Sequence, residues 1–164
     1  MLASCVYASF VVPLHENCKH MKVLLINGSP RKEGNTATAL AEVAKQLTKE
    51  GIESEIVWIG NKPIRGCVAC GQCAAKGLGR CVFDDDVCNR ISEKFADANA
   101  LIVGSPVYYG QPNGALLSVI QRAFYSNGAN IAGKPAAAIA GGQSVDEIGG
   151  GICQTSSTLY MSAL

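Results

Sequence analysis

The chain has 164 residues, of which 48% are hydrophobic and 16% charged, and its formal net charge is +1. This length suits a single domain with its own core, and the composition excludes a disordered chain. The near-neutral charge gives no electrostatic basis for binding nucleic acid or an anionic membrane, and no apolar run approaches the ~18 residues of a membrane span. We therefore expect a soluble protein without either partner.

Residues 1–20 are expected to form an extension outside the fold, which leaves residues 21–164 as one domain. A secretory leader begins with Lys or Arg and ends in a small-residue cleavage site. Here no basic residue precedes Lys19, and Pro13 interrupts the apolar run. A cleaved leader remains the alternative.

The first predicted strand is KVLLING, residues 22–28. It is a short apolar run bounded by glycine, which is typical of a strand buried on both faces. A helix is predicted next, because Leu40, Val43 and Leu47 recur at helical spacing. We expect Asn35 or Thr36 to cap this helix.

Between this strand and helix lies NGSPRKEGNT, residues 27–36, in a place where loops commonly hold a phosphate. It is not a Walker loop, because Asn35 stands where the lysine is required, and its two glycines do not match G-x-G-x-x-G. Hydroxyls, amides and one arginine at a helix start suit the terminal phosphate of a bound cofactor. The candidate donors are Ser29, Arg31, Asn35 and Thr36.

A second strand is predicted at residues 54–60, followed by a Gly- and Cys-rich loop at 61–83. In this loop Cys67, Cys70, Cys73 and Cys81 have the spacing C-x2-C-x2-C-x7-C. Compact thiolate runs suit an iron–sulfur cluster, whereas zinc more often takes two C-x2-C knuckles separated by a longer loop. Clustered cysteines of this kind indicate a metal or redox site in a reducing compartment.

Two more helices and two more strands complete the pattern. The first of these helices carries Val87, Ile91 and Phe95 at helical spacing. The second has on its inner side Leu116, Leu117, Ile120 and Phe124. The strands are residues 100–110 and 134–142. Asn113 is expected to cap the later helix, and Cys88 to be a small core residue. Strands that alternate with helices form a parallel sheet with right-handed crossovers. The predicted fold class is α/β, a doubly wound parallel sheet.

The C-terminal stretch starts a helical pattern, CQTSSTLYMSAL, and then ends. A doubly wound sheet of this order normally has a fifth strand and a last helix, so we expect a C-terminally short domain. Its fourth strand would be an open edge that favours pairing with another chain. Truncation and cover by a partner are both open interpretations.

MKVLLINGSPRKEGNT, SPVYYGQPNG and the clustered cysteines together resemble the NAD(P)H-dependent FMN reductase family of flavodoxin-like fold, and the cysteines resemble its iron–sulfur flavoprotein subgroup. The resemblance implies that residues 29–36 hold the FMN phosphate and that two later loops line the flavin ring. The ring-lining residues would be Pro106, Tyr108, Tyr109 and Gly110, and then Gly141, Gly142 and Gln143. All three loops follow predicted strand ends, where open α/β sheets bind ligands. The plainer interpretations are strand-end aromatics and ordinary helix caps.

The resemblance implies an enzyme, a cytoplasmic and oligomeric FMN-dependent NAD(P)H oxidoreductase. A reduced nicotinamide would pass hydride to FMN, and FMN would pass electrons to a small-molecule or protein acceptor. No side-chain acid or base is required, so we nominate no catalytic residue. The subgroup implies a 4Fe–4S cluster on the cysteine quartet, with unligated or switchable thiols, zinc and a disulfide as alternatives.

Three functions therefore compete. The first is the FMN reductase, and the second is an iron–sulfur flavoprotein that carries single electrons between protein partners. The third is a truncated flavin-binding remnant without catalysis. Bound iron separates the first two, and failure to bind flavin would favour the third.

Overall fold

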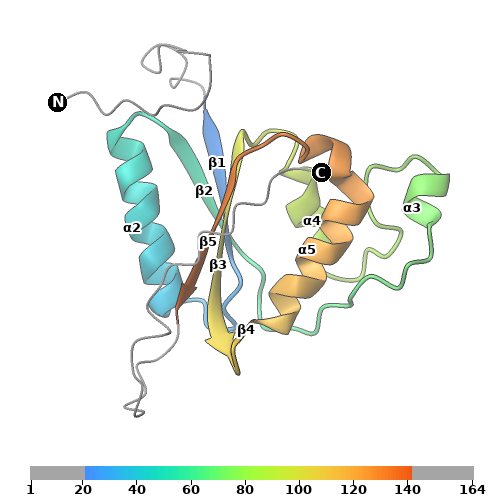
Figure 1. The fold of residues 1–164 in the computed structure, drawn as a ribbon, viewed down its shortest axis with the longest axis horizontal. Helices are drawn as coiled ribbons and strands as arrows, with labels where there is room; N and C mark the ends of the chain where they lie inside the picture. The colour runs from blue at the N-terminus through green and yellow to red at the C-terminus, as the bar shows by residue number, and fades with distance from the viewer. Residues whose placement is uncertain (1–20, 142–164) are drawn as a thin grey trace.

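The computed structural model describes residues 21–141 (Figure 1). Its sheet contains four parallel strands in the order β2-β1-β3-β5. These are β1 (Lys22–Asn27), β2 (Glu53–Trp58), β3 (Ala100–Tyr108) and β5 (Ala136–Gly141). A short strand, β4 (Gln111–Pro112), turns back antiparallel on the end of β3. The predicted α/β fold with a parallel, flavodoxin-like sheet is confirmed.

Helices cover both faces of this sheet (Figure 1). On one face lies α2 (Asn35–Lys49), and on the other lie α4 (Cys88–Glu93) and α5 (Gly114–Asn127). A single turn, α3 (Gln72–Ala75), interrupts the predicted 61–83 loop, and a 3-10 turn, η2 (Gly128–Asn130), follows α5. Among the described residues, no helix is both long and apolar enough to cross a membrane.

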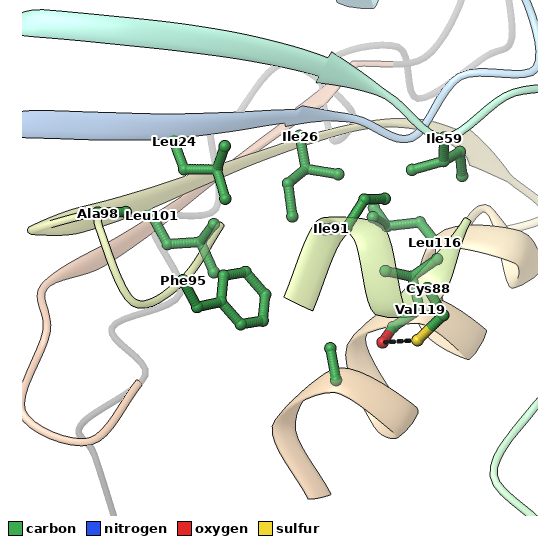
Figure 2. Packing of buried hydrophobic residues seen from close by; sticks show 11 residues of the cluster. Leu24, Ile26, Ile59, Cys88, Ile91, Phe95, Ala98, Leu101, Leu116 and Val119 are labelled. Atoms are coloured by element: carbon green, nitrogen blue, oxygen red, sulfur yellow. Dashed lines mark hydrogen bonds between the residues drawn. The ribbon is translucent and has the colours of Figure 1, made fainter. Parts of the chain in front are cut away.

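The core has two parts because successive side chains of β1 point to opposite faces. Leu24 and Ile26 pack in the larger cluster under α4 and α5, which Figure 2 shows. Val23 and Leu25 pack in the smaller cluster against Leu40 of α2. The strand is therefore buried on both faces, as its apolar run predicts.

Several sequence-based details need correction. Neither Asn35 nor Thr36 caps α2: its N-cap is Gly34, and no side chain accepts a hydrogen bond there. The stretch 100–110, predicted as a strand that runs into a turn, is a strand up to Tyr108 followed by a turn at Tyr109 and Gly110. The short strand β4 after this turn was not predicted. The cap of α5 is confirmed, since Asn113 Oδ1 accepts from the backbone N–H of Ala115 at 3.0 Å.

The inner side of α5 differs in part from the predicted one. Leu116 is buried, with Val119 and Ala123 one and two turns later, and these three face the larger cluster. The spacing of three and then four residues keeps them on one helix face. Leu117, predicted to point inward, lies outside both clusters, while Ile120 and Phe124 pack at the margin of the larger one. Residues 1–20 and 142–164, and with them Gly142, Gln143 and the short C-terminus, lie outside the described residues.

Candidate functional site

The predicted flavin-binding segments meet at one edge of the sheet. β1, β3 and β5 are neighbouring parallel strands, so their carboxyl ends lie side by side. Asn27 is paired in register with Gly104, and Pro106 with Gly141. This brings the loop after β1, the loop after β3 and the end of β5 together. Of the predicted third loop, only Gly141 belongs to the described residues.

The loop after β1 is held by hydrogen bonds around Ser29, which is 6% exposed. The backbone N–H of Ser29 donates to Asn27 Oδ1 at 3.0 Å, and Ser29 Oγ accepts from the N–H of Arg31 at 3.2 Å. Trp58 Nε1, from the end of β2, donates to the Ser29 carbonyl at 2.7 Å. The Arg31 and Asn35 side chains are exposed, so they face solvent from a fixed backbone.

The start of α2 offers donors without a competing acceptor. No side chain caps it, and its first turn contains no acidic residue. The N–H of Thr38 is the first in this helix to bond backward, to the Gly34 carbonyl at 2.9 Å. The earlier N–H groups of the turn and the positive end of the helix dipole therefore suit an anion, and a phosphate dianion gains most from them.

Two glycines bring the helices close to this edge. A Cβ on Gly28 would lie 2.7 Å from Leu116 Cδ2 and 2.9 Å from the Gly104 carbonyl oxygen. A Cβ on Gly104 would lie 2.8 Å from Thr36 Cγ2 and 2.9 Å from Leu40 Cδ1. The starts of α5 and α2 thus pack against backbone, and Thr36 is positioned over β3.

The loop after β3 is a tight hairpin that presents two tyrosines. Tyr108 pairs with Gln111, which leaves Tyr109 and Gly110 as a two-residue turn with φ of 50° and 76°. Both values lie in the left-handed region, which suits hairpin turns but is uncommon for an aromatic residue. Tyr108 is 53% exposed and Tyr109 is fully exposed. Their rings are therefore available at the same edge of the sheet as the loop after β1.

A separate cavity of about 900 Å³ is lined by residues 58–64 and 84–87 with Arg90 and Glu93. It contains none of the predicted flavin-binding residues. Its wall includes the carboxylates of Asp84, Asp85, Asp86 and Glu93. Each of these carboxylates is ion-paired with an arginine, and Lys62 and Arg90 also line the cavity. We do not assign FMN to this cavity, because none of the residues predicted to bind the flavin lines it.

The four predicted metal ligands line one pocket. Cys67, Cys70, Cys73 and Cys81 share it with the apolar side chains of Val68, Val82 and Phe83 and with three residues of α5. All four thiols are unpaired: Cys67 and Cys70 are exposed and Cys73 is buried. Within residues 21–141, no three His, Cys, Asp or Glu side chains are grouped closely enough to hold a metal ion. The donor set nevertheless fits an iron–sulfur cluster, because four thiols and no carboxylate face the pocket.

Arg122 of α5 is a pocket residue that the sequence analysis missed. It is only 1% exposed. Its Nε donates to Cys81 Sγ at 3.4 Å, and its Nη1 forms an ion pair with Asp86. Nη1 also donates to the Arg65 carbonyl at 3.2 Å, and Nη2 donates to the Phe83 carbonyl at 2.7 Å. Burial alone would lower the pKa of Arg122, but the bonds to Cys81 and Asp86 outweigh it and the pKa is raised. The guanidinium stays charged beside the thiols.

Asn89 and Cys88 of α4 hold the surrounding loop and core. Asn89 accepts from the Cys81 N–H and donates to the Cys81 carbonyl, each at 3.0 Å. Cys88 is fully buried, as predicted, and its Sγ donates to the Val119 carbonyl at 3.7 Å (Figure 2). Burial raises its pKa to about 11, so this thiol stays protonated at neutral pH. Cys88 is not one of the residues that line the cysteine pocket.

Comparison with known proteins identifies the family of this chain. Residues 21–161 match the sequence profile of the NADPH-dependent FMN reductase family. The chain belongs to this family. Among curated relatives, an iron–sulfur flavoprotein of Methanocaldococcus jannaschii is 39% identical over 102 residues, which cover 62% of this chain and 51% of that protein. An iron–sulfur flavoprotein of Methanosarcina thermophila is 34% identical over 112 residues, which cover 68% of this chain and 57% of that protein. The chain thus spans about half the length of the curated relatives it matches.

Solved structures support the fold of this FMN reductase family member. The enzyme RosB with a bound riboflavin-phosphate intermediate has a TM-score of 0.58 and 18% identity, covering 74% of this chain and 52% of RosB. An NADH:FMN oxidoreductase in its apo form has a TM-score of 0.52 and 22% identity, covering 74% of this chain and 58% of that protein. At these identities the likeness concerns the fold alone.

Proposed function

We propose that the protein binds FMN and transfers electrons from NAD(P)H through the flavin to a small-molecule or protein acceptor. Family membership supports a flavin oxidoreductase in general. The observation that carries the specific proposal is the start of α2, which has neither a side-chain cap nor an acidic residue and follows the anchored Ser29 loop at the carboxyl edge of β1. We further propose that the protein acts as a homo-oligomer in the cytoplasm.

In this proposal the chain's own residues bind and orient the cofactor. Ser29 and Thr36 contribute hydroxyls from a loop and a helix start that are fixed by neighbouring backbone. Arg31 adds a charged donor that no acidic side chain engages among the described residues. Tyr108 and Tyr109 offer aromatic surface beside the ring. When bound, FMN supplies the hydride-accepting ring, and the protein supplies position and electrostatics.

The experiment compares binding of FMN and riboflavin by fluorescence titration. Arg31→Ala should weaken FMN binding about tenfold, since a charge-assisted contact to phosphate contributes roughly 1.5–3 kcal/mol. It should leave riboflavin, which lacks the phosphate, unaffected. Lys32→Ala is the matched control, because it removes the same charge from the next exposed position of the loop. An equal loss of FMN affinity in both variants would mean that only the total charge of the loop matters, and not a direct contact of Arg31 with the phosphate.

Stopped-flow mixing with NADH and NADPH then tests the electron donor. Rapid bleaching of bound flavin by either nucleotide supports the reductase. A protein that binds no flavin after FMN is added would contradict the proposal and favour a non-catalytic remnant.

We propose as a second candidate that the cysteine quartet holds a 4Fe–4S cluster. Four thiols line one pocket beside the buried Arg122, and the two curated relatives described above are named iron–sulfur flavoproteins. Protein purified without oxygen should contain about four irons per chain, with matching acid-labile sulfide. Cys70→Ala, at an exposed position, should lose the iron, whereas Cys88→Ala, outside the pocket, should retain it. Iron that survives Cys70→Ala would contradict this assignment.

A further inference from the structure

Among the residues of α5 that line the cysteine pocket, Arg122 and Ser126 have no place in the flavin site. Arg122 and Ser126 are four residues apart, so they lie on the same face of the helix. Both line the pocket with all four cysteines. The Arg122 guanidinium donates to Cys81 Sγ at 3.4 Å.

Ser126 carries the second observation. Its Oγ is buried and has no hydrogen-bond partner among the described residues. A buried hydroxyl without a partner costs roughly 1–3 kcal/mol, so such groups in folded proteins usually await a ligand or water. Its pocket is lined by the four sulfurs, by apolar side chains and by two further polar residues, Arg122 and Tyr125. Arg122 has no acceptor, and Tyr125 is 60% exposed. A sulfur acceptor held in the pocket would satisfy this hydroxyl.

We propose that Arg122 and Ser126 are positioning residues that donate hydrogen bonds to the sulfurs of the quartet site and thereby raise the reduction potential of the group bound there. This inference rests on the second candidate function, the 4Fe–4S cluster. One electron, supplied by reduced flavin, adds one negative charge to the thiolate-held group, with no bond or proton transferred. Donors aimed at sulfur stabilise the more negative, reduced form and so raise the potential.

Arg122 is held by structural contacts that leave one N–H for a sulfur. Asp86 balances its charge, and the carbonyls of Arg65 and Phe83 accept from its two Nη groups. These contacts hold the guanidinium plane and leave Nε–H directed at Cys81 Sγ. Lysine at this position would keep the charge but lose the planar set of donors.

The test is a mediated redox titration of anaerobically reconstituted protein, followed by electron paramagnetic resonance. Ser126→Ala should shift the reduction equilibrium about tenfold toward the oxidised form, which for one electron is a fall of about 59 mV. Arg122→Lys should shift it in the same direction. Ser118→Ala is the control: it makes the same change on the same helix, but its hydroxyl donates to the Gly114 carbonyl and lies outside the pocket.

Ser126→Ala guards against a folding artefact, because it removes a hydroxyl with no partner and should not destabilise the protein. If the wild type holds iron and Ser126→Ala has an unchanged potential, the inference is wrong while the cluster assignment stands. If the wild type takes up no iron, the cluster assignment fails first and the inference fails with it. A fall of equal size in Ser118→Ala would also overturn the inference, since the effect would then belong to the helix as a whole.

Discussion

Replacement of Gly28 by alanine tests how the phosphate loop and α5 are packed together. The new Cβ would lie 2.7 Å from Leu116 Cδ2 and 2.9 Å from the Gly104 carbonyl oxygen. Ordinary contacts between carbons begin near ~3.5 Å, so Leu116 or the loop at Gly28 must move by roughly 0.8 Å. Leu116 is 1% exposed, and the Gly104 carbonyl accepts from the Gly28 N–H at 2.8 Å. Movement of Leu116 would disturb the packing of the core, and movement of the Gly104 carbonyl would weaken its hydrogen bond with Gly28.

The cost can be estimated from these contacts. Overpacking in a well-packed core costs about 1–3 kcal/mol. Gly28 does not have a left-handed backbone, so alanine can adopt its conformation. Alanine also restricts the unfolded chain, which stabilises the folded state by about 0.4–1 kcal/mol and offsets part of this cost. We expect Gly28→Ala to lower the free energy of unfolding by about 1–2 kcal/mol in urea titrations. FMN affinity should fall as well, because the shift falls on the loop that bears Ser29.

Gly114→Ala is the matched control on the helix that Gly28 contacts. A Cβ there meets nothing within 4 Å, and the residue opens α5. Alanine is a better helix former by up to about 1 kcal/mol, so this variant should be neutral or more stable. The reasoning is refuted if Gly28→Ala is as stable as the wild type, or if both variants lose the same stability.

Three further predictions concern other named contacts. Asn113→Ala should lower the free energy of unfolding by about 1–2 kcal/mol in denaturant titrations, because it removes the cap of α5 and the Nδ2 donor to the Gly28 carbonyl at 2.7 Å. Asn113→Asp keeps the cap and loses only the donor, so it should lose less stability; an Asn113→Ala protein as stable as the wild type would contradict both roles. Arg122→Met should lower the free energy of unfolding by about 3–5 kcal/mol, because it leaves the buried Asp86 without its ion-pair partner. The double variant with Asp86→Asn should recover much of that stability, and strict additivity in the double-mutant cycle would argue against the ion pair. Burial raises the pKa of Cys88 from 9.0 to about 11, so between these pH values the folded state keeps a proton that the unfolded state loses. The free energy of unfolding should therefore fall by about 1–3 kcal/mol as the pH rises through this range, and a Cys88→Ala protein with the same pH slope would rule this out.

Much of the fold was predictable because the strong signals are local. The KVLLIN run of β1 is apolar on both faces, and Asn113 precedes a clear helical pattern. The cap of α2 was mispredicted for an instructive reason. Asn35 and Thr36 are good capping residues by type, but a side chain that capped this helix would occupy the donors that an anion needs. The capping propensity of these residue types therefore fails to predict the N-cap at the helix start where we expect an anion to bind.

The pocket-forming contacts of Arg122 could not be predicted, because its partners are distant in sequence. Cys81 and Asp86 lie 41 and 36 residues away, and only the packing of α4 on α5 brings them together. One signal was present: an arginine lies on the apolar face between Val119 and Ala123, where a charge is rarely buried without a partner. The partner itself follows only from the three-dimensional structure.

The helix α5 joins the two candidate sites mechanically. At its start, Asn113 and Leu116 contact the backbone of Gly28, which begins the phosphate loop. Further along, Arg122 and Ser126 line the cysteine pocket. Nine residues separate Asn113 from Arg122, which at 1.5 Å per residue is roughly 14 Å along the axis. A continuous helix holds this spacing nearly constant, so α5 sets both the anchoring of the flavin loop and its separation from the cysteines.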